Sequence, residues 1–295
     1  MKKYKYFSTF TGIGGLDIGL EELGFECVGF SDIKKSSIKI YSGHYPKHEP
    51  FGDITKIDFS KIPDFDILTG GFPCQAFSLA GLRNGFKDKK GKLIFYLYDL
   101  LVAKKPKHFA LENVKGILNH DEGKTFDKVV RLLMHAGYHV RVVLLNAAHY
   151  GTAQSRERVI FLGSKEPFTL ENPVVKNSKI LFRDIRDTEG PFKTIPHSQR
   201  EIDKVEQKRT FSHELIGGYD RVGTLTTNMG CGEKVVGYGD WVRYLTPVEC
   251  ERLQGFEDGW TEGVSDSDRY FALGNAVNCE MSRYLFKEYL KGPWW

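Results

Sequence analysis

The sequence Phe10-Thr11-Gly12-Ile13-Gly14-Gly15 joins a strand-like run, residues 4–10, to a helix-like segment, residues 16–23. Glycines in such a turn let the main chain bend sharply and approach a ligand closely, beside the N-terminus of the following helix. A Gly-x-Gly-Gly turn alone is weak evidence, because an ordinary strand-to-helix connection can contain the same residues. Whether this turn indicates a ligand-binding site depends on the segments that surround it.

Strand-like and helix-like segments alternate through the first half of the chain. Runs rich in β-branched and aromatic residues, typical of strands, occupy residues 27–31, 65–69, 108–112, 140–146 and 159–163. Apolar residues with helical spacing occupy residues 36–41, 93–104 and 126–136. This alternation predicts a doubly wound, mostly parallel α/β sheet of the Rossmann-like type, with helices on both faces. Such sheets bind ligands outside the carboxyl ends of their strands.

The alternation fades after residue 163, which indicates a change of architecture. Residues 165–241 are polar and turn-rich, and we expect them to form a smaller second domain after a first domain at residues 1–164. Regular structure returns in residues 242–295, where Thr246, Pro247 and Glu249 have the spacing of a capping box with proline at the first helical position. The last helix, residues 276–290, is expected to pack back on the first domain.

Composition and charge exclude several classes of protein. No apolar run approaches the roughly 18 residues that a membrane helix needs, so we expect a protein of the cytoplasm without a membrane partner. The five cysteines are an odd number without a Cys-x-x-Cys pair, which indicates neither a disulfide framework nor a metal site. The net charge of +4 is small, but residues 83–92 hold five basic side chains against one acid. That run is typical of a solvated loop or of contact with a polyanion.

Acidic residues follow two more strand ends. Asp32 closes the strand at residues 27–31, about where an acid that binds ribose hydroxyls belongs. Asp53 follows Gly52 at the end of a short third strand. Either carboxylate can instead be a helix cap or a turn residue, and for each acid taken singly that reading is the stronger one. Together they strengthen the case for a ligand at the glycine-rich turn.

Cys74 and Glu112 are candidate catalytic residues at one edge of the sheet. Cys74 lies in Gly71-Phe72-Pro73-Cys74-Gln75, where proline and glycine fix a turn of the kind that presents a nucleophile. The alternative is an ordinary small buried residue, as most cysteines are. Glu112 ends the next strand and can meet Cys74 across one cleft as a general acid, or it can be the structural partner of an arginine. Arg156 and Arg158 are candidates for that arginine, or for holding a phosphate.

These segments together resemble the DNA (cytosine-5) methyltransferase family over nearly the whole chain. Asp32 stands where the family more often has glutamate, and Ala153 precedes Gln154 where the family usually has proline. The matching blocks are, in order, residues 10–15, Gly52-Asp53-Ile54, Gly71-Phe72-Pro73-Cys74-Gln75, Glu112-Asn113-Val114, Gln154-x-Arg156-x-Arg158, residues 243–256, and Gly274-Asn275-Ala276-Val277.

The resemblance implies S-adenosylmethionine as the cofactor, with Asp32 at its ribose and Asp53 at its adenine, and it implies no metal. In this family the thiolate, here Cys74, adds to carbon 6 of a flipped-out cytosine, and the carboxyl, here Glu112, hydrogen-bonds ring nitrogen 3. Arg156 and Arg158 would support Glu112 and the substrate. The cofactor-binding residues implied are Phe10, Thr11, Gly12, Ile13, Gly14, Gly15, Asp32, Ile33, Asp53, Ile54, Gly71, Pro73, Asn275 and Val277.

The resemblance also implies double-stranded DNA as the partner, with residues 165–241 as the target-recognition region. The basic run at residues 83–92 would then meet phosphates in a loop that closes over DNA. A monomer in a prokaryotic or phage setting is expected. The methyl mark would serve either restriction-modification, with a cognate restriction endonuclease as a partner in function only, or epigenetic marking. The DNA-binding residues implied are Gln75, Ser78, Arg83, Lys87, Lys89, Thr224 and Thr226, and a plain strand is the alternative for the last two.

Two other functions stay open at this point. A minor branch of the family acts on tRNA, although Gly-Phe-Pro-Cys-Gln-Ala-Phe-Ser, residues 71–78, resembles the DNA branch more. The other is a non-catalytic DNA-binding relative on a decayed scaffold. Decay would be expected to remove some catalytic residues, whereas Cys74, Glu112, Arg156 and Arg158 are all present.

Overall fold

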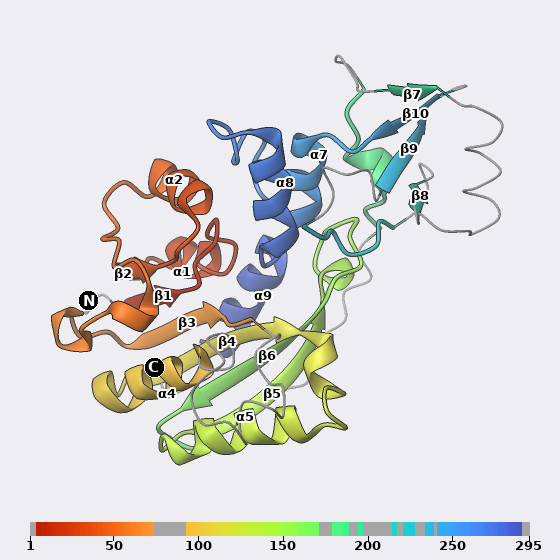
Figure 1. The fold of residues 1–295 in the computed structure, drawn as a ribbon. Coiled ribbons are helices and arrows are strands. Elements are labelled where there is room, and N and C mark those ends of the chain that lie inside the picture. Colours follow the sequence, from red (N-terminus) through yellow and green to blue (C-terminus); the bar gives the residue numbers. More distant parts are fainter. Residues whose placement is uncertain are drawn as a thin grey trace.

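The computed structural model describes residues 4–73, 93–170, 179–188, 194–196, 214–216, 221–227, 234–238 and 241–290. A six-stranded sheet and a four-stranded sheet organise these residues (Figure 1). The strands of the larger sheet are β1 (Lys5–Thr9), β2 (Glu26–Ser31), β3 (Ile67–Gly71), β4 (His108–Val114), β5 (His139–Asn146) and β6 (Glu157–Ser164). The helices are α1 (Ile18–Glu22), α2 (Lys35–His44), α4 (Leu93–Lys104), α5 (Lys124–His135), α7 (Pro247–Gln254), α8 (Asp266–Asn275) and α9 (Cys279–Tyr289).

The six-stranded sheet is mostly parallel and doubly wound, which confirms the predicted fold class. Its order is β2-β1-β3-β4-β6-β5. Strand β1 is parallel to β2 and β3, β3 is parallel to β4, and β6 is antiparallel to both of its neighbours. The chain moves from β1 to β2 on one side and then to β3 and β4 on the other, so the winding reverses between β1 and β3. Ligands bind at the carboxyl ends of strands at such a switch point.

Apolar layers cover both faces of this sheet because side chains alternate between the two faces along each strand. On β4, Phe109 and Leu111 are buried with apolar side chains of α4 and α5. Ala110, between them, is buried on the other face with side chains of α1 and α9. The hydroxyl of Ser282 on α9 donates to the Leu16 carbonyl at 2.5 Å, which ties the end of the chain to the turn after β1.

The C-terminal segment differs in detail from the prediction. Residues 276–290 do not form one helix, because α8 ends at Asn275 and the backbone of Ala276 is extended. Helix α9 begins at Cys279, where the side chain of Asn278 accepts a hydrogen bond from the third N–H of the helix. The extended link between α8 and α9 therefore falls within the Gly274-Asn275-Ala276-Val277 block.

Two shorter predictions can also be compared with the structure. The strand expected before Gly52 is only an isolated bridge between Phe30 and Pro50, so that prediction was wrong. The capping box is confirmed: the Thr246 hydroxyl accepts from the Glu249 N–H at 3.1 Å, and the Glu249 carboxylate accepts from the Thr246 N–H at 2.9 Å. Helix α7 thus begins where its sequence predicts.

The four-stranded sheet has the order β7-β10-β9-β8, and it extends past the expected domain limit at residue 241. Its last strand leads directly into α7, and the buried side chains of Arg243 and Glu249 join the two through an ion pair of 2.6 Å. The domain limits themselves stay a prediction. No helix in the described ranges is long and apolar enough to cross a membrane. The strands are β7 (Thr194–Pro196), β8 (Glu214–Ile216), β9 (Lys234–Tyr238) and β10 (Trp241–Tyr244).

Candidate functional site

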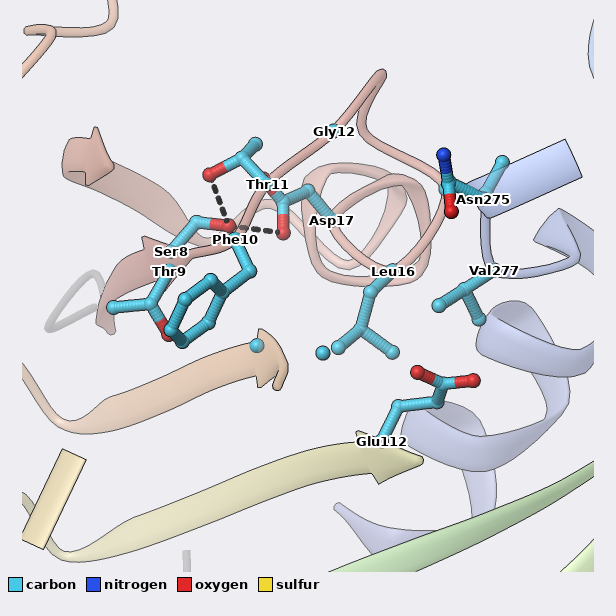
Figure 2. Close-up of a pocket in the computed structure, with 14 residues that line it drawn as sticks. Ser8, Thr9, Phe10, Thr11, Gly12, Leu16, Asp17, Glu112, Asn275 and Val277 are labelled. Atoms are coloured by element: carbon cyan, nitrogen blue, oxygen red, sulfur yellow. Dashed lines mark hydrogen bonds between the residues drawn. The ribbon is translucent and has the colours of Figure 1, made fainter. Parts of the chain in front are cut away.

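A pocket lies at the carboxyl ends of β1 and β3, at the switch point of the sheet (Figure 2). The empty space between its walls is about 400 Å³ and includes space open to solvent. The residues that line it come from β1 and its turn, the ends of β3 and β4, and the link between α8 and α9. They are Ser8, Thr9, Phe10, Thr11, Gly12, Gly15, Leu16, Asp17, Gly70, Gly71, Glu112, Asn275, Ala276 and Val277.

The turn after β1 has a backbone that depends on glycine. Phe10 has a φ of +50°, Gly12 of +59° and Gly14 of +89°. The left-handed conformation is open to glycine but unfavourable for phenylalanine, so surrounding contacts must hold the turn in place. One such contact is the Gly12 N–H, which donates to the Asp32 carboxylate at 2.8 Å and fixes the turn to the end of β2.

Main-chain segments approach one another closely at the pocket. A Cβ on Gly15 would lie 2.0 Å from the carbonyl oxygen of Val277, and a Cβ on Gly70 would lie 2.2 Å from Thr9 Oγ1. Only a residue without a side chain fits at these two points. The close approach of Gly15 to Val277 brings two predicted cofactor residues, Asn275 and Val277, into the pocket wall.

The predicted cofactor residues divide into those that line the pocket and those that lie outside its lining. Asp32 accepts the N–H of Lys34 at 2.8 Å in addition to that of Gly12. Asp53 accepts the N–H and the hydroxyl of Thr55 at 3.0 and 2.8 Å, which is the turn role that was its alternative. The predicted residues outside the lining are Ile13, Gly14, Asp32, Ile33, Asp53, Ile54 and Pro73.

Glu112 and Arg158 meet at the edge of the pocket. Glu112 Oε1 lies 2.7 Å from Arg158 Nε, and both side chains are nearly buried. Burial raises the pKa of the Glu112 carboxyl, while Arg158 and Arg156 oppose that rise. In the parallel pairing of β3 and β4, Glu112 is the register partner of Gly71, three residues before Cys74. The carboxyl is therefore at the strand end from which the Cys74 turn departs.

Arg156 is near enough to Glu112 for its charge to act on that carboxyl, but its hydrogen bonds go to the main chain. Its buried guanidinium donates to the carbonyls of Leu225, Gly274 and Ala276 at 2.9, 2.9 and 2.8 Å. Its Nε has no hydrogen-bond partner among the described residues. Arg156 thus fastens two distant segments of main chain to the start of β6, and within the described part of the chain Arg158 is the arginine that pairs with Glu112.

The segment that contains Thr224 and Thr226 is bound to the first sheet. The Thr224 hydroxyl donates to the Ser155 carbonyl at 3.0 Å, and the Gln154 side chain accepts the Leu225 N–H at 3.0 Å. Thr226 is exposed, and a Cβ on Gly274 would lie 2.3 Å from its carbonyl oxygen. Of the two threonines, the second therefore has the more accessible side chain.

Sequence reasoning missed several residues at this site, namely Ser8, Thr9, Leu16, Asp17 and Ala276 in the pocket lining and Asn113 next to Glu112. Asn113 donates to the Phe72 carbonyl at 2.8 Å and so braces the chain just before Cys74; its place in Glu112-Asn113-Val114 was the available signal. Asp17 is 1% exposed and lines the pocket. Its sequence position, just before a helix, is that of a common cap and gave no such signal.

Part of the predicted site lies outside the described residues. The predicted nucleophile, Cys74, follows Pro73, the last residue of the described range 4–73. The predictions concerned are Cys74, Gln75, Ser78, Arg83, Lys87 and Lys89.

The fold and the pocket define a doubly wound α/β enzyme with a ligand site at its switch point and a carboxyl beside it. Comparison with solved structures agrees. The Entamoeba histolytica methyltransferase EhMeth superposes with a TM-score of 0.80, covers 99% of this chain and 100% of its own, and is 21% identical. At 21% sequence identity the superposition shows only that the two proteins share a fold, which is the fold of a methyltransferase.

Sequence comparison then gives the family. The family model for C-5 cytosine-specific DNA methylase matches residues 4–238 and 189–291. Type II methyltransferase M.NlaX of Neisseria lactamica is 34% identical over 97% of this chain and 96% of its own length. Type II methyltransferase M.HaeII of Haemophilus aegyptius is 36% identical over 97% and 92%. The chain belongs to the C-5 cytosine-specific DNA methylase family and is a DNA cytosine-5 methyltransferase. The tRNA and non-catalytic alternatives are not favoured.

Proposed function

We propose that this enzyme transfers the methyl group of S-adenosylmethionine to carbon 5 of a cytosine flipped out of duplex DNA, through a covalent adduct with Cys74. The observation that supports this most is the place of Glu112. Its carboxyl lines the pocket, is held by Arg158 at 2.7 Å, and pairs in the sheet with Gly71. One carboxyl thus adjoins both the proposed cofactor pocket and the strand end that leads to the nucleophile.

The pocket suits S-adenosylmethionine. A Cβ on Gly12 would meet no heavy atom within 4 Å, so the main chain of the turn is open to a ligand. Asp32 stands beside this turn, and Asp53 follows Gly52, whose carbonyl accepts from the Ser31 hydroxyl at the end of β2 at 2.6 Å. Carboxylates at these positions can bind ribose hydroxyls and the adenine amino group. The exposed Ile33 offers an apolar surface next to Asp32. When bound, the cofactor supplies a methyl group activated by a positively charged sulfur.

Glu112 and Arg158 would hold the target base while Cys74 reacts with it. A buried carboxyl with a raised pKa retains its proton more readily, so Glu112 can donate a hydrogen bond to ring nitrogen 3. The Cys74 thiolate adds to carbon 6, and the electron pair of the ring double bond moves to carbon 5, where the methyl group is received. Loss of the carbon 5 proton to water restores the double bond and expels the thiolate.

The proposal also assigns a function to each part of the chain and a role in the cell. We assign residues 1–164 to catalysis, 165–241 to target recognition and 242–295 to closing the cofactor pocket. DNA contact is assigned to Gln75, Ser78, Arg83, Lys87, Lys89, Thr224 and Thr226. Because the named relatives are type II methyltransferases, protection of host DNA from a cognate restriction endonuclease in the cytoplasm is the expected role, performed by a monomer.

Covalent trapping tests this chemistry. Duplex DNA with 5-fluorocytosine in place of cytosine should form a stable adduct in the presence of S-adenosylmethionine, because fluorine cannot leave carbon 5 as a proton does. The adduct should be absent with Cys74→Ala and unchanged with the control Cys27→Ala, which alters a half-buried thiol on β2. A Cys74→Ala protein that still forms the adduct would contradict the assigned nucleophile. Methyl transfer to total tRNA but not to genomic DNA would contradict the substrate.

A further inference from the structure

Asp17 is the centre of a buried hydrogen-bond network in the wall of the pocket. Its carboxylate accepts from the Ser8 hydroxyl at 2.8 Å, the Tyr41 hydroxyl at 2.8 Å and, at longer range, the Thr69 hydroxyl at 3.4 Å. The Thr11 hydroxyl donates to Ser8 at 3.1 Å, so the network reaches the glycine-rich turn (Figure 2). Asp17, Ser8 and Thr11 all line the pocket.

Among the described residues, no positively charged side chain forms an ion pair with the carboxyl of Asp17. Asp17 and Glu112 are the ionisable groups among the described lining residues, and only Glu112 has an arginine partner there. Burial raises the pKa of the Asp17 carboxyl to about 7, so it ionises near neutral pH. Burial also lowers the pKa of the nearby His48 to about 4, which leaves that ring neutral. The titratable groups that face Asp17 are Tyr6, Glu21, Cys27, Tyr41, Tyr45 and His48.

The neighbours of Asp17 can adapt to either of its charge states. While the carboxylate is ionised, the Tyr41 hydroxyl donates to it and accepts from His48 Nδ1, 3.0 Å away, when that nitrogen carries the proton. Once Asp17 is protonated, it can donate to Tyr41, whose own proton turns to an unprotonated His48 Nδ1. In both states Asp17 and Tyr41 keep their hydrogen bond to each other, whereas in the first state the unprotonated His48 Nε2 faces Glu21 Oε1 at 3.6 Å. Asp17 can therefore change charge with its contact to Tyr41 kept.

A buried negative charge in a pocket wall is most stable when a positive ligand binds nearby. S-adenosylmethionine carries a sulfonium charge, and its demethylated product, S-adenosylhomocysteine, has lost it. We propose that Asp17 is a specificity-determining residue whose ionised carboxylate raises the affinity of the pocket for S-adenosylmethionine relative to its affinity for S-adenosylhomocysteine. This inference rests on the proposed use of that cofactor and adds a reason why the spent cofactor leaves.

The expected size of the preference follows from Coulomb's law. One unit charge acting over roughly 10 Å through an effective dielectric constant of about 20 changes a binding constant on the order of tenfold. Groups common to both ligands, such as the adenine, ribose and amino-acid part, cancel in the ratio of the two dissociation constants. The ratio therefore reports the sulfonium charge, whereas either constant alone would also report the shape of the pocket.

Calorimetry with the two ligands, without DNA and without turnover, tests the inference. The ratio of dissociation constants, S-adenosylhomocysteine over S-adenosylmethionine, should rise several-fold in the wild type between about pH 6 and about pH 8, as Asp17 ionises. In Asp17→Asn the ratio should be about tenfold lower at the higher pH and independent of pH. The control Asp99→Asn removes an exposed acid on α4 and should behave as the wild type.

A second variant separates charge from support of the turn. Ser8→Ala removes the hydroxyl between Thr11 and Asp17 but keeps the carboxylate. It should weaken both ligands by similar factors and leave the ratio and its pH dependence in place. An Asp17→Asn protein that binds both ligands with the wild-type ratio, or loses both equally, would overturn the inference. A wild type that binds neither ligand would refute the proposed cofactor and this inference with it.

Discussion

Substitution of Gly15 by alanine should push apart two main-chain segments in the wall of the proposed cofactor pocket. The added Cβ would lie 2.0 Å from the Val277 carbonyl oxygen and 3.0 Å from its carbonyl carbon. To bring the oxygen to 3.0 Å, the shortest separation that real Cβ atoms tolerate, the two main-chain segments must move apart by at least 3.0 − 2.0 = 1.0 Å. The obstacle is backbone, so no side chain can rotate away. Because the φ of Gly15 is outside the left-handed region, the whole effect is steric.

The substitution should affect both the stability of the protein and its catalytic rate. Overpacking of a close contact lowers the free energy of unfolding by about 1–3 kcal/mol. A displacement of about 1 Å at a catalytic site reduces the rate about 100-fold. We therefore expect Gly15→Ala to remain folded, to bind S-adenosylmethionine much more weakly, and to lose about two orders of magnitude in kcat/KM.

Gly43→Ala is a matched control for this experiment. Gly43 lies inside α2, and a Cβ there would meet no heavy atom within 4 Å. Alanine in a helix interior should raise the free energy of unfolding by about 0.5–1 kcal/mol and leave the cofactor affinity unchanged. Urea unfolding and calorimetry with S-adenosylmethionine measure both quantities. A Gly15→Ala protein with wild-type stability and cofactor affinity would refute the reasoning from the close approach.

Three further predictions concern ionisable groups. Glu112→Gln should lower the rate of methyl transfer by about 100-fold or more, while the affinity for the cofactor stays within a few-fold of the wild type. Single-turnover methyl transfer and calorimetry measure these two quantities. The wild-type rate should fall as pH rises through the raised pKa of Glu112. For Asp17, the folded pKa of about 7 lies above its usual 3.8, so the native state binds more protons and the free energy of unfolding falls as pH rises between these values. Asp17→Asn should therefore be stabilised over the wild type by up to roughly 4 kcal/mol more at pH 8 than at pH 4 in urea unfolding; an equal difference at both pH values would contradict this. Glu249→Ala should lower the free energy of unfolding by about 3–5 kcal/mol, because it leaves the Arg243 guanidinium buried without its partner; a loss below about 1 kcal/mol would contradict this.

Local sequence patterns predicted most of the first sheet because its strands are short runs of β-branched and aromatic residues and its helices have apolar residues at helical spacing. The six strands lie within a few residues of their predicted ranges, and α4 begins and ends where predicted. The start of α7 was also predictable, since a capping box and an N-terminal proline depend on residues close in sequence. The position of the pocket followed from the glycine-rich turn and the rule for switch points.

Contacts between residues far apart in sequence were not predictable in this way. Arg156 and Arg158 are two positions apart, and the sequence does not distinguish them as partners of Glu112. The register of β4 with β6 determines that Arg158 is the one that reaches Glu112. Asp17 resembles a helix cap until Tyr41 and Thr69 are folded around it. The break between α8 and α9 was also not predictable, because the carbonyl of the extended Ala276 accepts from the guanidinium of Arg156, 120 residues away in sequence.

The link between α8 and α9 connects the two halves of the proposed reaction. On one side Val277 abuts Gly15 in the cofactor pocket, and on the other Gly274 abuts the carbonyl of Thr226 in the segment proposed to contact DNA. Arg156 binds carbonyls of this link and of Leu225 with one rigid, planar group. A displacement of the link by ligand on either side must therefore strain the same guanidinium, because its donors cannot move independently. This geometry gives a physical route by which an ordered cofactor pocket and an ordered recognition segment support each other, with Arg156 as a positioning residue that need not touch the cytosine.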